Sequence, residues 1–330
     1  MPDASASSPE ETLAWEAQQR PRAALLALVA GNFTLFGGIA ASLLFADFPA
    51  VSVLDGIRDA AGLPLTVGEG LRTAQIRFYD DHVVGLLLST VVLAIGSAAI
   101  AGVLGYLFRA TAARTPLLPR IALYGALLGP IMVGVAKIVE QVSNAIAARA
   151  FVSEGDFSTA AAHDALAGGV TLAAQIVAQL GVLLMAFSFV LVSLHAMRAG
   201  LLTRFMGILG MLVGGLFIIP LGGGLPIVQC FWLIAVGFLI IGRWPKGRPL
   251  AWETGRAEPW PTQQELREQR DLARGGDGGK GHDADDHADP VEEEEEEDEA
   301  VVDGLPGTPV PRPRGAAHSS SKKRKNRKRR

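Results

Sequence analysis

Long apolar runs alternate with short polar connections along the first three quarters of the chain. A helix of about 20 apolar residues is enough to cross the ~30 Å hydrocarbon core of a bilayer. The pattern therefore predicts an all-α protein, a polytopic membrane helix bundle whose six transmembrane helices lie within residues 23–243. The six predicted spans are Ala23–Phe45, His82–Phe108, Leu118–Gln141, Ala167–Met197, Arg204–Leu221 and Ile227–Gly242.

Polar segments flank this domain on both sides. Residues 1–22 predict a cytoplasmic N-terminal tail, and the first apolar run is too long for the core of a cleaved signal peptide. Residues 244–330 predict a cytoplasmic C-terminal tail, in which a capping-box pattern starts a short helix near 262–273. The tail then becomes glycine-rich, acidic and finally basic, a polyampholyte composition that predicts disorder because it buries too little apolar surface.

The longest connection between predicted spans, Ala46–Asp81, contains two segments with helical patterns, Val51–Ala61 and Gly68–Tyr79. We interpret both as short surface helices. In a second polar connection, Glu154–Asp164, either Asp156 or Ser158 is placed to cap a helix.

Lys and Arg near the ends of the spans indicate the orientation, because cytoplasmic loops are enriched in basic residues. If the N-terminus is inside, four basic residues lie outside: Arg58, Arg72, Arg77 and Arg149. Ten lie inside: Arg20, Arg22, Arg109, Arg114, Arg120, Arg198, Arg204, Arg243, Lys246 and Arg248. We therefore predict a multi-pass protein of the cell membrane with both termini in the cytoplasm.

Composition adds little to this interpretation. The 330 residues are 49% hydrophobic and 19% charged, and the net charge of −3 averages an apolar domain with a highly charged tail. The single cysteine, Cys230, lies in an apolar run, which excludes a disulfide within one chain and indicates a buried apolar role.

No catalytic, cofactor-binding or metal-binding constellation stands out, so we expect a protein that is not an enzyme. The segment Gly275–Gly281 lacks the first glycine and the hydroxyl residue of a phosphate-binding loop, and no strand precedes it. His282 and His287, with the aspartates between them, have ligand chemistry for a weak metal site, but their surroundings favour a solvated linker.

Ionisable groups inside a span suggest function, because charge at membrane depth is costly. Lys137 lies ~24 Å along its helix from Ile121, close to the outer boundary of the core, with Glu140 one turn further. Two interpretations stay open: interfacial anchoring, or an outward-facing polar site. The candidate residues are Asp80, Asp81, His82, Lys137, Glu140, Gln175, Gln179 and Asn32.

The amides among these residues either line a path or bond neighbouring helices together. Glycines recur on one face of several spans, with Gly210 and Gly214 four residues apart, and predict close helix packing and a helix-mediated oligomer.

The C-terminus ends in a dense basic block that suits anionic lipid headgroups or, alternatively, nucleic-acid phosphates. A tail tethered to a membrane favours the lipid. The block comprises Lys322, Lys323, Arg324, Lys325, Arg327, Lys328, Arg329 and Arg330.

Two segments carry a resemblance. GLLTRFMG at Gly200–Gly207, followed by a short pair of spans and then RWPKGRPLAWETGRAEPWP at Arg243–Pro261, resembles a recurring group of bacterial six-span membrane proteins. That group has no established function, so the resemblance implies only the fold and a membrane location, over about Arg109–Glu265.

Two hypotheses for function follow. The first is a non-enzymatic membrane scaffold or interaction protein whose charged tail meets lipid or cytoplasmic partners. The second is a small-solute or ion transporter with a path from the outer polar cluster past Gln175, Gln179 and Asn32. A continuous polar cavity would favour transport, and a closely packed bundle would favour the scaffold.

Overall fold

A computed structural model of the protein describes residues 8–66, 69–115, 117–218, 226–245 and 247–261, with Glu265, Arg267 and Leu272. Every regular element in these residues is a helix, which confirms the all-α prediction for the described part of the chain. The chain divides into two compact units, Met1–Asp271 and Leu272–Arg330. Almost all described residues belong to the first unit.

Several predictions from the sequence fall outside the described residues. They are the basic block at 322–330, the segments 275–281 and 282–287, and most of the helix predicted near 262–273, of which Glu265, Arg267 and Leu272 are described as helical.

Four helices are long and apolar enough to cross a membrane, which supports a membrane protein. Each has at least 30 residues and so reaches ~45 Å or more, beyond the ~30 Å of a hydrocarbon core. Two further apolar helices have 15 residues each, α8 (Arg204–Ile218) and α9 (Ile227–Ile241). The four long helices are α1 (Pro9–Leu44), α4 (Val83–Ala112), α5 (Arg120–Glu154) and α7 (Gly169–Arg198).

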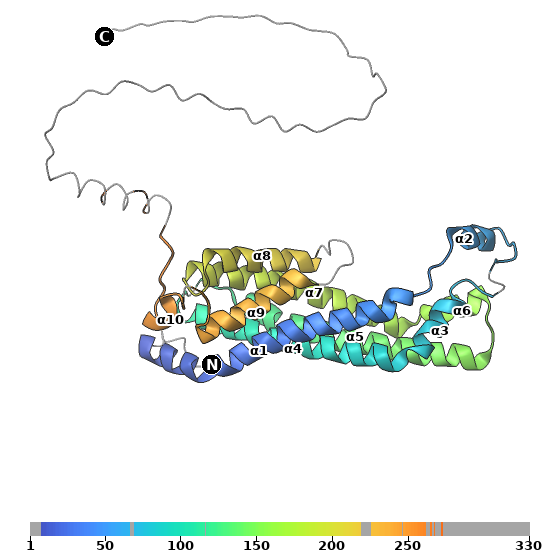
Figure 1. The fold of residues 1–330 in the computed structure, drawn as a ribbon, viewed down its shortest axis with the longest axis horizontal. Helices are drawn as coiled ribbons and strands as arrows, with labels where there is room; N and C mark the ends of the chain where they lie inside the picture. The colour runs from blue at the N-terminus through green and yellow to red at the C-terminus, as the bar shows by residue number, and fades with distance from the viewer. Residues whose placement is uncertain are drawn as a thin grey trace, which may run out of the picture. The chain divides into compact units, whose positions relative to one another are not determined.

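The long helices pack in a continuous series, α1 against α4, α4 against α5 and α5 against α7. Helix α8 packs on α7, and α9 packs on α1 (Figure 1). We call the end of the bundle where α1 begins and α4 ends the basic end. The short helix α10 (Ala251–Thr254) lies there, whereas α3 (Thr73–Asp81) and α6 (Thr159–Leu166) lie at the far end (Figure 1).

Helix α1 begins 14 residues before the predicted span, at Pro9 instead of Ala23. A capping box explains the start: Ser8 Oγ accepts from the Glu11 backbone N–H at 3.2 Å, and the Glu11 carboxylate accepts from the Ser8 N–H at 3.1 Å. The part of the predicted N-terminal tail that the structure describes is therefore mostly helical.

Glycines bring α5 and α7 into backbone contact. A Cβ atom placed on Gly129 would lie 2.6 Å from the Met185 nitrogen and 2.9 Å from the Gly181 oxygen. Between helices surrounded by lipid, such close approach replaces the hydrophobic effect as the source of packing energy. The close packing that the sequence predicts is present at this contact.

A small second core closes the far end. Its buried residues come from three helices, α3, α5 and α6: Ile76, Ala148, Phe151 and Ala162. Backbone hydrogen bonds tie the connecting loops together, for example Gly70 N–H to the Phe157 oxygen at 2.8 Å. Helices α2 (Val53–Ala60) and α3 overlap the two predicted surface helices.

Helix α2 is held to the loop that follows it by Asp55. Its carboxylate accepts from the Thr66 N–H at 2.8 Å and from the Thr66 hydroxyl at 2.6 Å. These hydrogen bonds favour the anion and lower the pKa of Asp55 from its usual value.

The glycine contact yields a matched pair of substitutions. Gly129→Ala should lower the free energy of unfolding by about 1–3 kcal/mol, because the new Cβ meets backbone atoms that cannot move aside. Gly215→Ala on α8 should be neutral or stabilising by up to ~1 kcal/mol, since no atom outside its own stretch of helix lies within 4 Å of a Cβ placed there. Unfolding of both variants in one detergent measures the difference, and equal stability would contradict the contact.

Candidate functional site

The structure brings three of the predicted polar residues together at α5 and α7. Lys137 Nζ lies 2.8 Å from the Glu140 carboxylate, and the Gln175 amide donates to the other carboxylate oxygen at 3.0 Å. The Lys137 side chain is 55% exposed and that of Glu140 is 16% exposed. Lys137 is also ~26 Å along α5 from Arg120, so its exposure and depth suit an anchor at the membrane surface.

The predicted residues at the junction of α3 and α4 are separate from this pair. Within the described residues, Asp80, Asp81 and His82 make no ion pair with Lys137 or Glu140. Asp80 and Asp81 end α3, and His82 stacks on Phe78 with ring centroids 4.3 Å apart. Burial, together with the nearby charge of Glu140, raises the pKa of Tyr79 in α3.

The last two predicted residues lie apart from the ion pair. The Asn32 amide donates to the Leu28 oxygen of its own helix at 2.8 Å, and Gln179 is exposed on α7. The eight residues predicted from the sequence therefore do not form one hydrogen-bonded array in the structure.

A different charged cluster is buried at the basic end. Glu16 of α1 is fully buried, and both its carboxylate oxygens accept from the guanidinium of Arg114, which follows α4. The same guanidinium donates to the Ala251 oxygen at 2.7 Å. A bidentate pair of this kind is strong and directional, so it fixes α1, the end of α4 and α10 to one another.

Arg20 and Trp252 extend the cluster. Arg20 donates to the Trp252 oxygen at 2.9 Å and lies 3.7 Å from the Glu16 carboxylate. The guanidinium carbons of Arg20 and Arg114 lie 5.9 and 5.7 Å from the centre of the Trp252 ring, within range of a cation–π interaction.

Aromatic rings complete the cluster. Tyr106 of α4 stacks on Trp252 at 5.9 Å and on Trp15 of α1 at 5.5 Å. The indole N–H of Trp252, a residue only 1% exposed, donates to the Leu201 oxygen at 2.8 Å. Residues 247–261, which we call the strap, are thus held on the bundle, although the sequence predicts a cytoplasmic tail from residue 244.

The strap lies against the other segment that carries the resemblance. Gly200 has a φ of +77°, and a Cβ atom there would overlap the Glu258 oxygen, so glycine is required. The Glu258 N–H donates to the Ala199 oxygen at 3.1 Å, and the Trp260 indole donates to the Leu202 oxygen at 2.9 Å. The two segments singled out in the sequence therefore form one contact.

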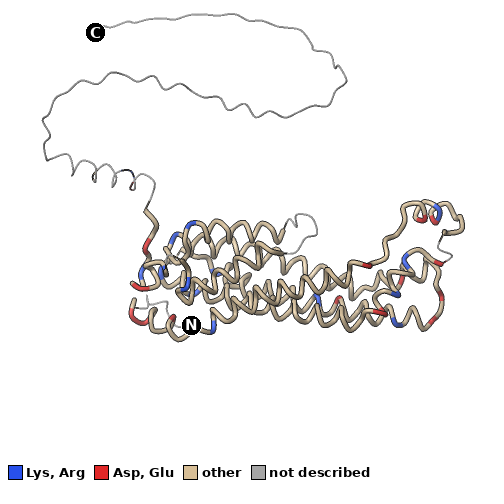
Figure 2. Tube along the Cα trace, in the orientation of Figure 1, with Lys and Arg blue, Asp and Glu red and all other residues tan. Residues whose placement is uncertain are grey.

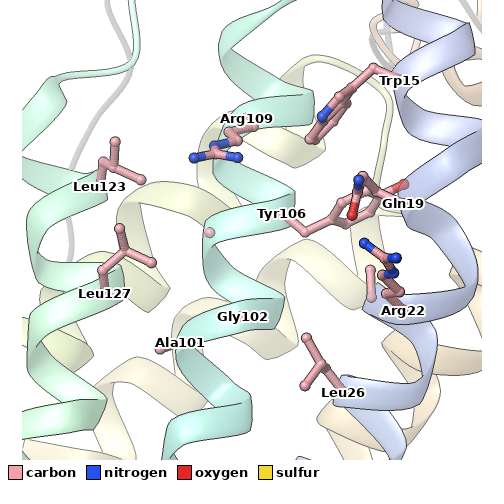
Figure 3. A pocket seen from close by; sticks show the side chains of 12 residues that line it. Trp15, Gln19, Arg22, Leu26, Ala101, Gly102, Tyr106, Arg109, Leu123 and Leu127 are labelled. Carbon is pink, nitrogen blue, oxygen red and sulfur yellow. The ribbon is translucent and has the colours of Figure 1, made fainter.

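Beside this cluster, α1, α4 and α5 line a cavity of about 270 Å³ that is open on one side. Figure 3 shows α4 as its floor, with α1 and α5 as its walls. Its lining combines two arginines and other polar groups with apolar side chains and small residues: Trp15, Gln19, Arg22, Ala23 and Leu26 from α1; Ala101, Gly102, Gly105, Tyr106 and Arg109 from α4; and Leu123 and Leu127 from α5.

Sequence reasoning missed Glu16 and Arg114 because it treated both as solvated. One local signal was available: Glu16 is four residues before Arg20 and directly follows Trp15, which is unusual for a purely polar tail. The partner of Glu16 is 98 residues away, and no local pattern identifies it.

Among the described residues, no group of three or more His, Cys, Asp or Glu side chains is placed to hold a metal ion. Comparison of the chain with protein-family models, curated proteins and solved structures finds no match.

The buried Glu16–Arg114 pair predicts that a single conservative substitution has a large effect on stability. Glu16→Gln should lower the free energy of unfolding by about 3–5 kcal/mol, because Arg114 then keeps its charge without a carboxylate partner. Glu16→Met combined with Arg114→Met should recover most of that loss, since no buried charge remains.

Glu10→Gln is the matched control, because Glu10 is exposed in the first turn of the same helix. It should change stability by less than ~0.5 kcal/mol. Thermal unfolding of all four proteins measures the effect, and a Glu16→Gln variant as stable as Glu10→Gln would refute the role of the pair.

Proposed function

We propose that the protein is a non-enzymatic membrane scaffold with six spans and a charged cytoplasmic tail, which holds its C-terminal strap at the basic end. The observation that carries the proposal is the docking of the strap. Trp252 is buried, and Arg20 and Arg114 donate to the backbone oxygens of the strap. A tail that only had to be soluble would need none of these contacts.

The packing of the bundle favours a scaffold over a transporter. Backbone contact at Gly129 brings α5 and α7 together beside Gly181, and the groove between the same two helices nearer Glu140 is lined by apolar side chains. Lys137 is half exposed, and the amide of Asn32 is engaged within its own helix. The transporter hypothesis is therefore supported by one ion pair, and the polar residues named for its path do not form a connected series within the described part of the chain.

Six spans rather than four are supported by the surfaces of α8 and α9. Each helix buries one side against the bundle and leaves large apolar side chains on the other, including Phe205, Leu212 and Phe231, which are 58%, 57% and 49% exposed. Lipid is the natural neighbour of such faces. Their described lengths correspond to ~22 Å, which is most of the ~30 Å thickness of a hydrocarbon core.

The orientation follows from the basic residues. The described ends of α1, α4, α7, α8 and α9 near α10 carry arginine (Figure 2), and basic residues mark the cytoplasmic side. We infer that the basic end, the strap and both termini are cytoplasmic.

Reporter fusions test this topology. Fusions after Arg114 and Arg248 should report the cytoplasm, and fusions after Gly62 and Glu154 should report the outside, because of the basic asymmetry. A fusion after Gly223 distinguishes the number of spans: an outside signal is expected for six, and a cytoplasmic signal would leave four.

Limited proteolysis tests the docking of the strap. Trypsin cleavage after Arg256 requires the strap to leave the bundle, so Trp252→Ala should accelerate it by a factor of about 100 or more. Leu250→Ala is the control within the same segment, because Leu250 is 65% exposed and should leave the rate unchanged. Equal cleavage rates in the wild type and Trp252→Ala would refute an anchored strap.

A flux measurement distinguishes the scaffold hypothesis from the transporter hypothesis. Vesicles reconstituted with the wild-type protein should show no more proton or cation flux than protein-free vesicles. Flux that disappears in Glu140→Gln, at equal reconstitution, would make the polar cluster at α5 and α7 a transport site.

A further inference from the structure

We propose that the cavity between α1, α4 and α5 binds one anionic phospholipid, with its phosphate between Arg22 and Arg109 and the start of an acyl chain against Leu26 and Leu127. This site is built from the bundle itself and is separate from the basic block predicted to bind lipid at the C-terminus.

The charge of the cavity is positive and uncompensated. Arg22 and Arg109 are exposed at its edge, and neither makes an ion pair or hydrogen bond within the described residues. None of the lining residues is acidic. Arg20 and Arg114, close by, both reach the Glu16 carboxylate, so the lack of a partner distinguishes the two cavity arginines.

A buried hydroxyl in the lining also lacks a partner. Tyr106 is only 6% exposed, and its hydroxyl makes no hydrogen bond of good geometry, although Arg20 lies beside it. A buried polar group without a partner is costly, and a phosphate oxygen in the cavity would accept from it. Figure 3 shows Tyr106 between α4 and α1, on the same side as Gln19 and Arg22.

The rest of the cavity suits the apolar part of a lipid. Gly102 and Gly105 have no side chains, so the surface of α4 is depressed there. Cβ atoms placed on these glycines would lie nearest to the side chains of Leu26 and Leu127, respectively. The volume of about 270 Å³ is just below the ~300–1,000 Å³ of pockets for drug-sized ligands. The cavity therefore takes a headgroup and the first carbons of a chain, and the remaining chain lies along the outside of the bundle.

The site is also at the correct depth. Arg22 directly precedes the apolar run that begins at Ala23, and Arg109 is in the last turn of α4. Trp15, on the edge of the cavity, is of the residue type that prefers the headgroup level. Guanidinium groups at this level match phosphate geometry with two parallel hydrogen bonds. Because leucines line the other side, an amphiphile fits better than free phosphate.

Brominated lipid tests the site in the full-length protein in detergent. Phosphatidylglycerol brominated at the first carbons of its acyl chains should quench the fluorescence of Trp15 saturably, and Trp15→Phe should remove that saturable component from the signal of the five tryptophans. Arg22→Gln with Arg109→Gln should weaken binding by about 25-fold, about fivefold for each charge removed. Arg198→Gln, an exposed arginine at the same end outside the cavity, should bind like the wild type.

Two further arms separate the sources of the signal. Phosphatidylcholine with the same chains should bind at least tenfold more weakly, and inorganic phosphate should compete only at far higher concentration than the lipid. Gly102→Leu, which fills the cavity and keeps both charges, should also weaken lipid binding. The C-terminal basic block is common to every variant, so its contribution cancels in each comparison between variants measured with the same lipid.

The proposal is overturned if the double arginine variant binds phosphatidylglycerol like the wild type, or if phosphatidylcholine quenches equally well. It is equally overturned if quenching persists in Trp15→Phe, or if Gly102→Leu, folded as judged by its melting temperature, binds with unchanged affinity.

Discussion

The buried carboxylate of Glu16 is the constraint on which the basic end depends. A carboxylate taken out of water costs several kcal/mol unless charged donors replace the water. Arg114 supplies two such donors, and its remaining N–H groups reach the oxygens of Ala251 and Ala110. One side chain thus links the start of α1, the end of α4 and the strap, and moving any of the three would leave a charge without a partner.

The rest of the bundle is held by a different kind of interaction. Lipid tails are as apolar as leucine, so burial of leucine between helices yields little, and close backbone approach at small residues supplies the packing energy. Gly129 and Gly181 provide it between α5 and α7. Such glycine contacts set the distance between two helices but do little to select which helices pack together. The Glu16–Arg114 ion pair at the basic end selects the packing partners strongly. The two together give a bundle with one well-defined end.

The sequence predicts the helices well because their cause is local. Apolar runs of sufficient length become α4 and α7 with ends close to those predicted, and α5, which starts close to its predicted residue but continues 13 residues beyond Gln141 to Glu154. The early start of α1 and the docked strap depend instead on contacts between distant segments. Glu16 looks solvated until Arg114 is placed beside it, and Trp252 looks like part of a tail until the turn at Gly200 leaves the Leu201 oxygen free to accept its N–H. Composition cannot reveal either partner.

The same argument separates the two candidate sites. Lys137 and Gln175 both donate hydrogen bonds to the Glu140 carboxylate, and the exposed Lys137 ammonium can bond to water or headgroups with its other N–H groups. No group in that cluster therefore requires a ligand. At the basic end, Glu16 accepts from Arg114 and also lies near Arg20, and no second carboxylate is available to Arg22 and Arg109 in the cavity lining. A protein interior would balance such charges, but a headgroup layer supplies anions from outside. The two arginines that make no ion pair within the described residues are therefore the ones for which we propose a lipid partner, whereas Arg20 and Arg114 hold the fold together.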